Sequence, residues 1–117
     1  RSNMRPEALK KLAVEALDDL KGKEIVAIEV SHLTGLMDYV IICTGTSSRH
    51  AKALANNVAV EAKKNDVIPR GIEGHSGSEW VLVDLGDVVV HVMQPETRSF
   101  YDLERLWSGD ASTDSAE

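Results

Sequence analysis

The stretch most suggestive of chemistry is residues 44–50, TGTSSRH, where a turn of small residues leads into a helical pattern. Free backbone N–H groups at the start of a helix can bind an anion. Arg49 and His50 strengthen this interpretation, because cations in the first turn oppose the helix dipole and are better tolerated beside bound negative charge. Ser47, Arg49 and His50 are therefore candidate contacts for an anion or an RNA phosphate. The alternative is an ordinary helix cap beside a solvated basic face.

Catalysis at this turn would need acidic metal ligands, and the sequence does not supply them in the usual arrangement. A nucleotidyltransferase-like site holds Mg²⁺ with a pair of carboxylates, usually about two residues apart on a neighbouring strand. Asp84 and Asp87 are separated by a turn, and Glu29 stands alone on its strand. The sequence predicts a protein that is not an enzyme and has no cofactor. A divergent nucleotidyltransferase-like nucleotide-binding protein is the alternative.

The remaining nucleophilic and metal-ligating residues favour structural roles. Cys43 lies in an apolar strand pattern, where a cysteine is more often a small buried hydrophobe than a nucleophile. His91, between two valines, is interpreted as a core histidine hydrogen-bonded to a neighbour. The four histidines have none of the close spacings of a metal motif, so we predict no metal site.

Length and composition limit the class of protein. The chain has 117 residues, enough for one domain, and its 43% hydrophobic content supports a single core. No apolar run approaches the ~20 residues of a membrane-spanning helix and no signal-peptide pattern opens the chain, so we expect a cytoplasmic protein that does not contact membranes. Its one cysteine fits a reducing compartment. The formal charge of −6 argues against a broad phosphate-binding surface.

Hydrophobic periodicity predicts helices and strands that alternate along the chain. Helices are predicted at residues 6–22 and 48–65 and, as a short acidic helix, after Pro95. Strands are predicted at residues 24–30, 38–44, 67–72, 79–84 and 87–93. The first two strands are expected to form an antiparallel pair and the last two a hairpin, with the third at an edge after a helical crossover. The predicted fold class is α/β, a single-domain mixed sheet of about five strands with flanking helices.

Aromatic residues gather in the stretch 79–107, which contains four of the five in the chain. Trp80 begins a strand after a Gly/Ser loop, where an indole is expected to be partly exposed, and tryptophan is enriched at binding hot spots. Phe100 and Trp107 are interpreted as core residues. Arg98 and Asp102 have the spacing of a helical ion pair. From the residues alone, the chain is predicted to be a binding module.

The same stretch resembles the Iojap-related ribosomal silencing factors. The resemblance covers residues 6–107 and implies a nucleotidyltransferase-like fold without the corresponding chemistry. It rests on Trp80, Asp84, the VVVH run ending at His91, Arg98 and FYDLERLW at residues 100–107, with LMDY at 36–39, CTGTS at 43–47, Arg49, His50 and GIEG at 71–74 upstream.

The resemblance also implies a function. Such a protein would repress translation by binding the large ribosomal subunit through its fourteenth large-subunit protein and sterically blocking the small subunit, especially in starvation or stationary phase. An assembly factor for the large subunit is an alternative. An acidic protein suits a basic ribosomal protein as partner. A minor contact to ribosomal RNA and a homodimer in the free state complete the expected partners.

We expect the contact surface on the exposed side of the 79–93 hairpin and on the segment that follows it. Trp80 is the predicted anchor, and its loss should release the protein from large subunits without unfolding it. The domain itself is expected at residues 6–107, after a cloning remnant and N-terminal lead at 1–5 and before a disordered acidic tail at 108–117. The predicted contact residues are Trp80, Leu82, Asp84, Met93, Glu96 and Arg98.

Overall fold

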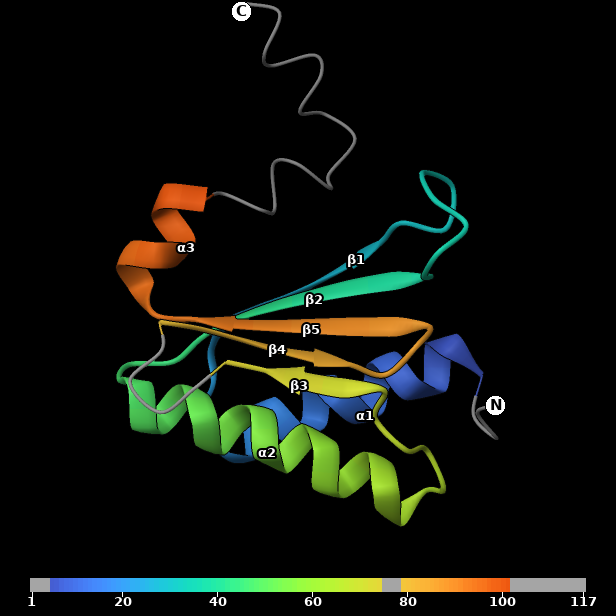
Figure 1. Ribbon diagram of the computed structural model, residues 1–117, viewed down its shortest axis with the longest axis horizontal. Helices are drawn as coiled ribbons and strands as arrows, with labels where there is room; N and C mark the ends of the chain where they lie inside the picture. The colour runs from blue at the N-terminus through green and yellow to red at the C-terminus, as the bar shows by residue number, and fades with distance from the viewer. Residues whose placement is uncertain (1–4, 75–78, 102–117) are drawn as a thin grey trace, which may run out of the picture.

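The computed structural model describes residues 5–74 and 79–101, which form a mixed five-stranded sheet and three helices (Figure 1). The predicted domain edge at residue 107 and the predicted tail lie outside the described residues. The helices are α1 (Pro6–Asp19), α2 (Ser48–Lys64) and α3 (Pro95–Tyr101), and the strands are β1 (Lys23–Glu29), β2 (Tyr39–Thr44), β3 (Gly71–Glu73), β4 (Trp80–Asp84) and β5 (Val88–Met93).

The strands lie in the order β1-β2-β5-β4-β3, with β2 and β5 parallel and the other neighbours antiparallel. The predicted antiparallel pair, hairpin, crossover and edge strand are confirmed. The edge strand is shorter than predicted, because the chain is still leaving α2 at Val67, whose N–H bonds to the carbonyl of Ala62. Pairing with β4 begins only at Arg70, whose N–H donates to the carbonyl of Asp84.

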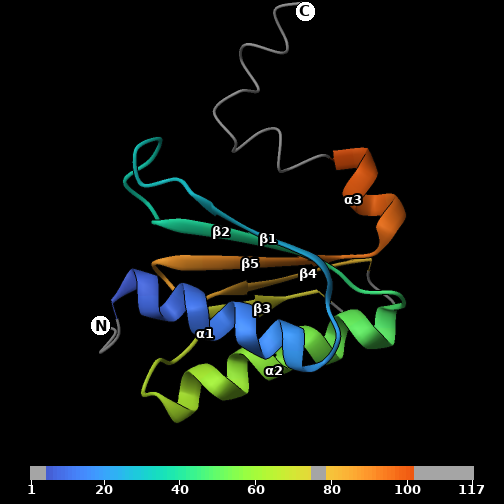
Figure 2. The same cartoon turned by 180° about the vertical axis from the view of Figure 1, so that it is seen from behind.

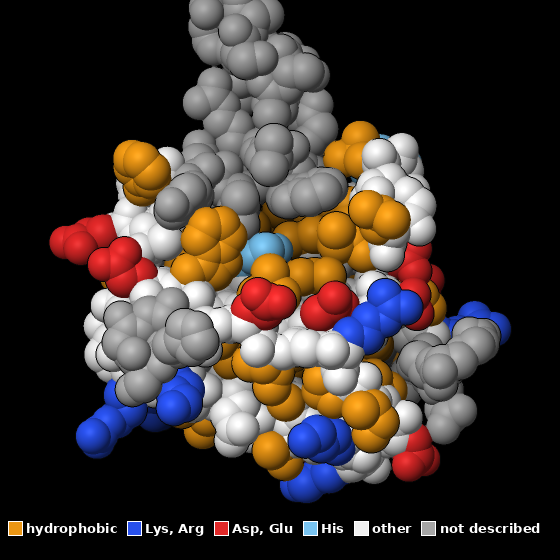
Figure 3. All heavy atoms as spheres, in the orientation of Figure 1, with side chains coloured by type: hydrophobic (Ala, Val, Ile, Leu, Met, Phe, Trp, Pro, Cys, Tyr) orange, Lys and Arg blue, Asp and Glu red, His pale blue; other side chains and the backbone are white. Residues whose placement is uncertain are grey.

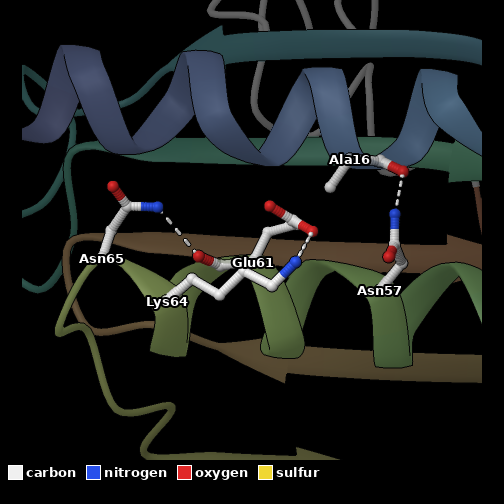
Figure 4. A network of polar contacts seen from close by, with 5 residues as sticks. All are labelled: Ala16, Asn57, Glu61, Lys64 and Asn65. Atoms are coloured by element: carbon white, nitrogen blue, oxygen red, sulfur yellow. Dashed lines mark hydrogen bonds and ion pairs between the residues drawn. The ribbon is translucent and has the colours of Figure 1, made fainter.

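Helices α1 and α2 cover one face of the sheet and enclose the main core (Figures 1 and 2). Their apolar residues recur at the three- and four-residue spacing that places them on one side of a helix. The two helices are also joined to each other, since Asn57 Nδ2 donates to the carbonyl of Ala16 at 2.8 Å (Figure 4). The largest fully buried side chains of this core are Leu9, Leu17, Ile41, Leu54, Val58, Val83, Val88 and Val90.

Two glycines allow the backbone to approach this core closely. A Cβ on Gly45 would lie 2.9 Å from the backbone of Ala51, so only glycine lets the β2–α2 turn pass against the helix. A Cβ on Gly22 would lie 2.5 Å from the sulfur of Cys43. The residue with left-handed backbone at the end of α1 is Lys21, at φ 64°, and not Gly22 itself. Helix α1 thus ends at Asp19, three residues before the predicted stop at Gly22, and Gly22 is required for packing.

The other face of the sheet carries a second, smaller cluster. Here α3 and the β1–β2 loop rise from opposite ends of the sheet, on the side away from α1 and α2 (Figures 1 and 2). None of the helices in the described part of the chain is long and apolar enough to cross a membrane. The fully buried members of this cluster are Val30, Val40, Ile42 and Met93.

Candidate partner-binding face

The side of the sheet away from α1 and α2 presents a row of apolar, partly exposed side chains. Strand pairing aligns Val26, Ile42, His91 and Leu82 in one cross-strand row, and Ile28, Val40 and Val89 in the next. In Figure 3 hydrophobic side chains surround a histidine in the upper half of the view, above acidic side chains. We define the outer face by its six partly exposed members, Val26, Ile28, Trp80, Leu82, Val89 and His91.

Exposed apolar side chains stand at both ends of the outer face. Leu36, in the β1–β2 loop, is 82% exposed, and Phe100, on α3, is 80% exposed. The prediction that Phe100 is a core residue is therefore wrong. Phe100 is exposed because Thr97 and Arg98 take the inward positions of the short helix α3. Leu36 was not singled out from the sequence, although a leucine beside Gly35 in a loop is a signal that could have found it.

Trp80 and His91 form a polar contact on the outer face, with Trp80 at the end of the sheet nearest α3. The indole N–H of Trp80 donates to Nδ1 of His91 at 3.1 Å, and the ring centroids lie 5.8 Å apart at an interplanar angle of 53°. Burial lowers the pKa of His91 from 6.5 to about 4, so the ring is neutral at pH 7. The hydrogen bond of His91 and the partial exposure of Trp80 are confirmed, but His91 is itself partly exposed and is not the core residue that was predicted.

Carboxylates border the outer face. Asp84 follows Leu82 on the same side of β4, and its Oδ1 accepts from the N–H of Gly86 at 2.8 Å, which fixes the β4–β5 turn. Glu73 extends the row of Leu82 on β3, and Glu96 is exposed on α3. Of the predicted contact residues, Trp80, Leu82 and Asp84 thus lie together on one strand, with Glu96 on the neighbouring helix.

Met93 and Arg98 are not on the surface, and their prediction as solvent-facing contacts is wrong. Met93 is 0% exposed, paired with Trp80 on the correct side of the sheet but covered. Arg98 is 6% exposed because α3 directs it inward across the sheet end. Its Nη1 donates to the carbonyl of Glu24 at 2.6 Å and to Oγ1 of Thr44 at 2.8 Å. The predicted partner Asp102 lies outside the described residues.

The turn before α2 contains the predicted anion or RNA contacts, Ser47, Arg49 and His50. Hydrogen bonds to side chains of this segment already occupy two of its backbone N–H groups. Oγ of Ser47 accepts from the N–H of His50 at 3.1 Å, which is the helix cap considered as the alternative. Nδ1 of His50 accepts from the N–H of Thr46 at 2.9 Å, so its Nε2 carries the proton and donates to the carbonyl of Leu20 at 2.8 Å. Ser47 and Arg49 are exposed and His50 is partly exposed, but only the side chain of Arg49 has no part in this local bonding of the turn.

A groove of about 480 Å³ lies beside Arg49, between α2 and the β3 edge. Lys52 and Asn56 line the same groove from α2, and Ile72 lines it from β3. This groove is on the helix-covered side of the sheet, so the structure does not bring the two sets of predicted site residues together. The Lys and Arg side chains visible in Figure 3 lie mostly in its lower half, away from the outer face.

Cys43 is an interior residue, as predicted. Burial raises the pKa of its thiol to about 11, and Sγ lies 3.7 Å from the carbonyl oxygen of Thr44. A thiol with this pKa is almost wholly protonated at pH 7 and is therefore a poor nucleophile. Within residues 5–74 and 79–101, no three His, Cys, Asp or Glu side chains are grouped to hold a metal ion.

Comparison with known proteins identifies the family. Residues 3–117 match the family model described as "Ribosomal silencing factor during starvation". The chain belongs to the ribosomal silencing factor family. The ribosomal silencing factor of Chromobacterium violaceum is 53% identical over 106 residues, which cover 91% of this chain and 87% of that relative. The resemblance drawn from Trp80 and the residues around it is confirmed, and the family's description links it to silencing of ribosomes in starvation, a role in regulating translation.

Solved structures of this ribosomal silencing factor's relatives have the same fold. A crystal structure from Chromobacterium violaceum superposes with a TM-score of 0.87 at 52% identity, covering 90% of this chain and 88% of that one. The predicted mixed α/β fold is therefore confirmed, and its likeness to nucleotidyltransferases stays a prediction. A more distant relative is the mouse "Mitochondrial assembly of ribosomal large subunit protein 1", 35% identical over 101 residues, or 83% of this chain and 44% of the mouse protein.

Proposed function

We propose that this ribosomal silencing factor represses translation in the cytoplasm by seating its outer face on the large ribosomal subunit. The contact would be the fourteenth large-subunit protein, and the bound domain would block the small subunit sterically. The observation that carries the proposal is a partly exposed apolar sheet face that includes Trp80, with Leu36 and Phe100 exposed at its ends. A contiguous apolar patch that contains a tryptophan is typical of protein interaction sites.

The charge around the outer face supports a basic protein as the partner. Glu73, Asp84 and Glu96 surround the apolar residues, and the chain as a whole carries a formal charge of −6. Complementary charge speeds encounter and fixes orientation between partners. A phosphate-rich RNA surface would instead be repelled from this side of the molecule.

A subunit-joining experiment tests the proposal. Purified protein is mixed with separated ribosomal subunits at raised Mg²⁺, and sedimentation records joined ribosomes and the fraction that carries the protein. We expect the protein to migrate with free large subunits and the joined fraction to fall as protein is added. Unchanged joining, with the protein left at the top of the gradient, would contradict the proposal.

The main alternative role is assembly of the large subunit, which the name of the mouse relative states for that protein. Both roles use the same contact at different times, so the joining experiment does not separate them. Immature large subunits accumulating in cells that lack the protein would favour assembly. The proposal contains no catalytic step, and saturable binding of Mg²⁺–ATP in calorimetry would favour the nucleotide-binding alternative.

We also propose that the free protein is a homodimer, because an apolar face left in water favours pairing. Light scattering at micromolar concentration is expected to give twice the chain mass of 12.8 kDa. A monomer at that concentration would contradict the homodimer and leave the ribosome contact untouched.

For ribosomal RNA we propose a minor contact through Arg49 and Lys52, in place of the predicted Ser47 and His50, whose side chains bond within the protein. Changing both cations to alanine should reduce the slope of log affinity against log salt by up to about 1.8, since each phosphate contact contributes roughly 0.7–0.9. Lys63→Ala, on the same helix but outside the groove, is the control. An unchanged slope in the double variant would remove this contact.

A further inference from the structure

The hydrogen bond between Trp80 and His91 helps to fix the orientation of the indole on the outer face. The two residues are diagonal neighbours on adjacent antiparallel strands, because Trp80 pairs with Met93 and His91 pairs with Leu82. Diagonal positions on one sheet face are within reach of aromatic side chains. The 3.1 Å hydrogen bond from the indole N–H then selects one orientation of the Trp80 ring.

We propose that His91 is a positioning residue for partner binding, which holds the Trp80 indole by accepting its N–H so that the contact surface is preformed. This inference rests on the proposed use of the outer face. A side chain already ordered in the free protein loses less conformational entropy on binding than one that is ordered only on contact. His91 therefore contributes to affinity without itself being the anchor.

The surroundings of His91 keep it in the accepting form. Its cross-strand neighbours are Ile42 on β2 and Leu82 on β4, and its neighbours along β5 on the same face are Val89 and Met93. Among the described residues, the nearest charged groups on this face by strand register are the carboxylates of Asp84 and Glu73, at the rim. Apolar surroundings disfavour the imidazolium, which agrees with the lowered pKa of His91. At neutral pH, Nδ1 stays available to the indole.

Acid should release the indole. Since the pKa of His91 is lowered from 6.5 to about 4, the unfolded chain binds this proton more tightly than the folded one. The stabilisation from neutral His91 is thus complete above about pH 6.5 and is lost as the pH falls toward 4. Protonated Nδ1 would be a donor facing a donor, so the hydrogen bond to Trp80 would break.

Two substitutions distinguish the effect of the hydrogen-bond acceptor of His91 from the effect of its aromatic ring. His91→Phe keeps an aromatic ring but has no acceptor for the indole N–H. In His91→Asn the ring is lost, but the side-chain amide oxygen can accept in place of Nδ1. Binding to large subunits at pH 7.5 should weaken roughly tenfold for His91→Phe, the equivalent of about one net hydrogen bond, and by less than about threefold for His91→Asn. Equal affinities for both variants, whether high or low, would overturn the proposal because the acceptor would then make no difference.

Fluorescence tests the same inference without the ribosome. Replacing Trp107 by Phe leaves Trp80 as the remaining tryptophan of a chain that has two. Its emission should change with a midpoint near pH 4, and His91→Asn should abolish that step. A midpoint near pH 6.5, or a step that persists in His91→Asn, would overturn the proposal. If the wild-type protein does not bind large subunits, the proposed function fails, yet this titration still decides whether His91 holds the indole.

Discussion

Replacing Arg98 by alanine should lower the free energy of unfolding by about 3 kcal/mol. This is the largest loss of stability that we expect from changing one side chain of α3. The guanidinium donates to Thr44 Oγ1 and to the carbonyl of Glu24, and a hydrogen bond from a charged group contributes a net stabilisation of about 1.5–3 kcal/mol. Its removal also leaves both acceptors without this donor. Urea denaturation followed by circular dichroism measures the loss.

Two variants make the result interpretable. Arg70→Ala removes an exposed arginine from the other end of the sheet and should change stability by less than about 0.5 kcal/mol. Arg98→Lys keeps the charge without the planar fork of donors and should fall between wild type and Arg98→Ala. A loss below about 1 kcal/mol in Arg98→Ala would mean that α3 is held by other contacts, of which Thr97 Oγ1 to Glu79 Oε1 at 2.9 Å is the first to test.

The stability of α3 bears on function because α3 forms one end of the outer face. Arg98 ties α3 to β1 and β2, and Thr97 ties it to the residue before β4. These two inward contacts leave Phe100 and Glu96 outward. Weakening the contacts of Arg98 should therefore reduce partner binding indirectly, through the position of Phe100, without any change at Trp80.

Local pattern was enough to predict the five strands, the β1–β2 pair and the β4–β5 hairpin, but not the parallel pairing of β2 with β5 that joins them. The alternation in β4 and β5 places Trp80, Leu82, Val89 and His91 on one side, and strand pairing confirms it. The same alternation places Met93 on that side correctly, but cannot reveal that it is covered, because cover depends on which segments lie over the end of the sheet. Periodicity predicts the face of the sheet to which a side chain points. Whether that side chain is buried depends on the tertiary contacts, which periodicity does not predict.

The misplaced site residues all depend on contacts between distant parts of the chain. Arg98 is buried because its acceptors belong to residues 74 and 54 positions earlier, which no helical pattern around Pro95 discloses. His50 looked available for an anion, yet its Nε2 bonds to a carbonyl 30 residues away at the end of α1. Ser47, in contrast, caps its own helix through a local contact, and that role was foreseen from the sequence.

Trp80→Ala should weaken binding to large subunits by at least about thirtyfold, corresponding to ~2 kcal/mol or more for an aromatic residue at the centre of an interface. Leu82→Asp should have a comparable effect, because it adds a charge to the apolar row beside His91 and would have to be desolvated on binding. Affinity is measured by sedimentation with labelled protein, after circular dichroism has established that each variant is folded.

Val60→Asp is the matched control for these two variants. Val60 is also apolar and is 39% exposed, but it lies on α2, on the helix-covered side of the sheet. If the outer face is the contact, Val60→Asp should bind within about twofold of wild type while both outer-face variants fail. Wild-type affinity in folded Trp80→Ala would remove Trp80 from the contact. Weakening by Val60→Asp alone would move the contact to α2, where the groove of Arg49 and Lys52 would become its centre.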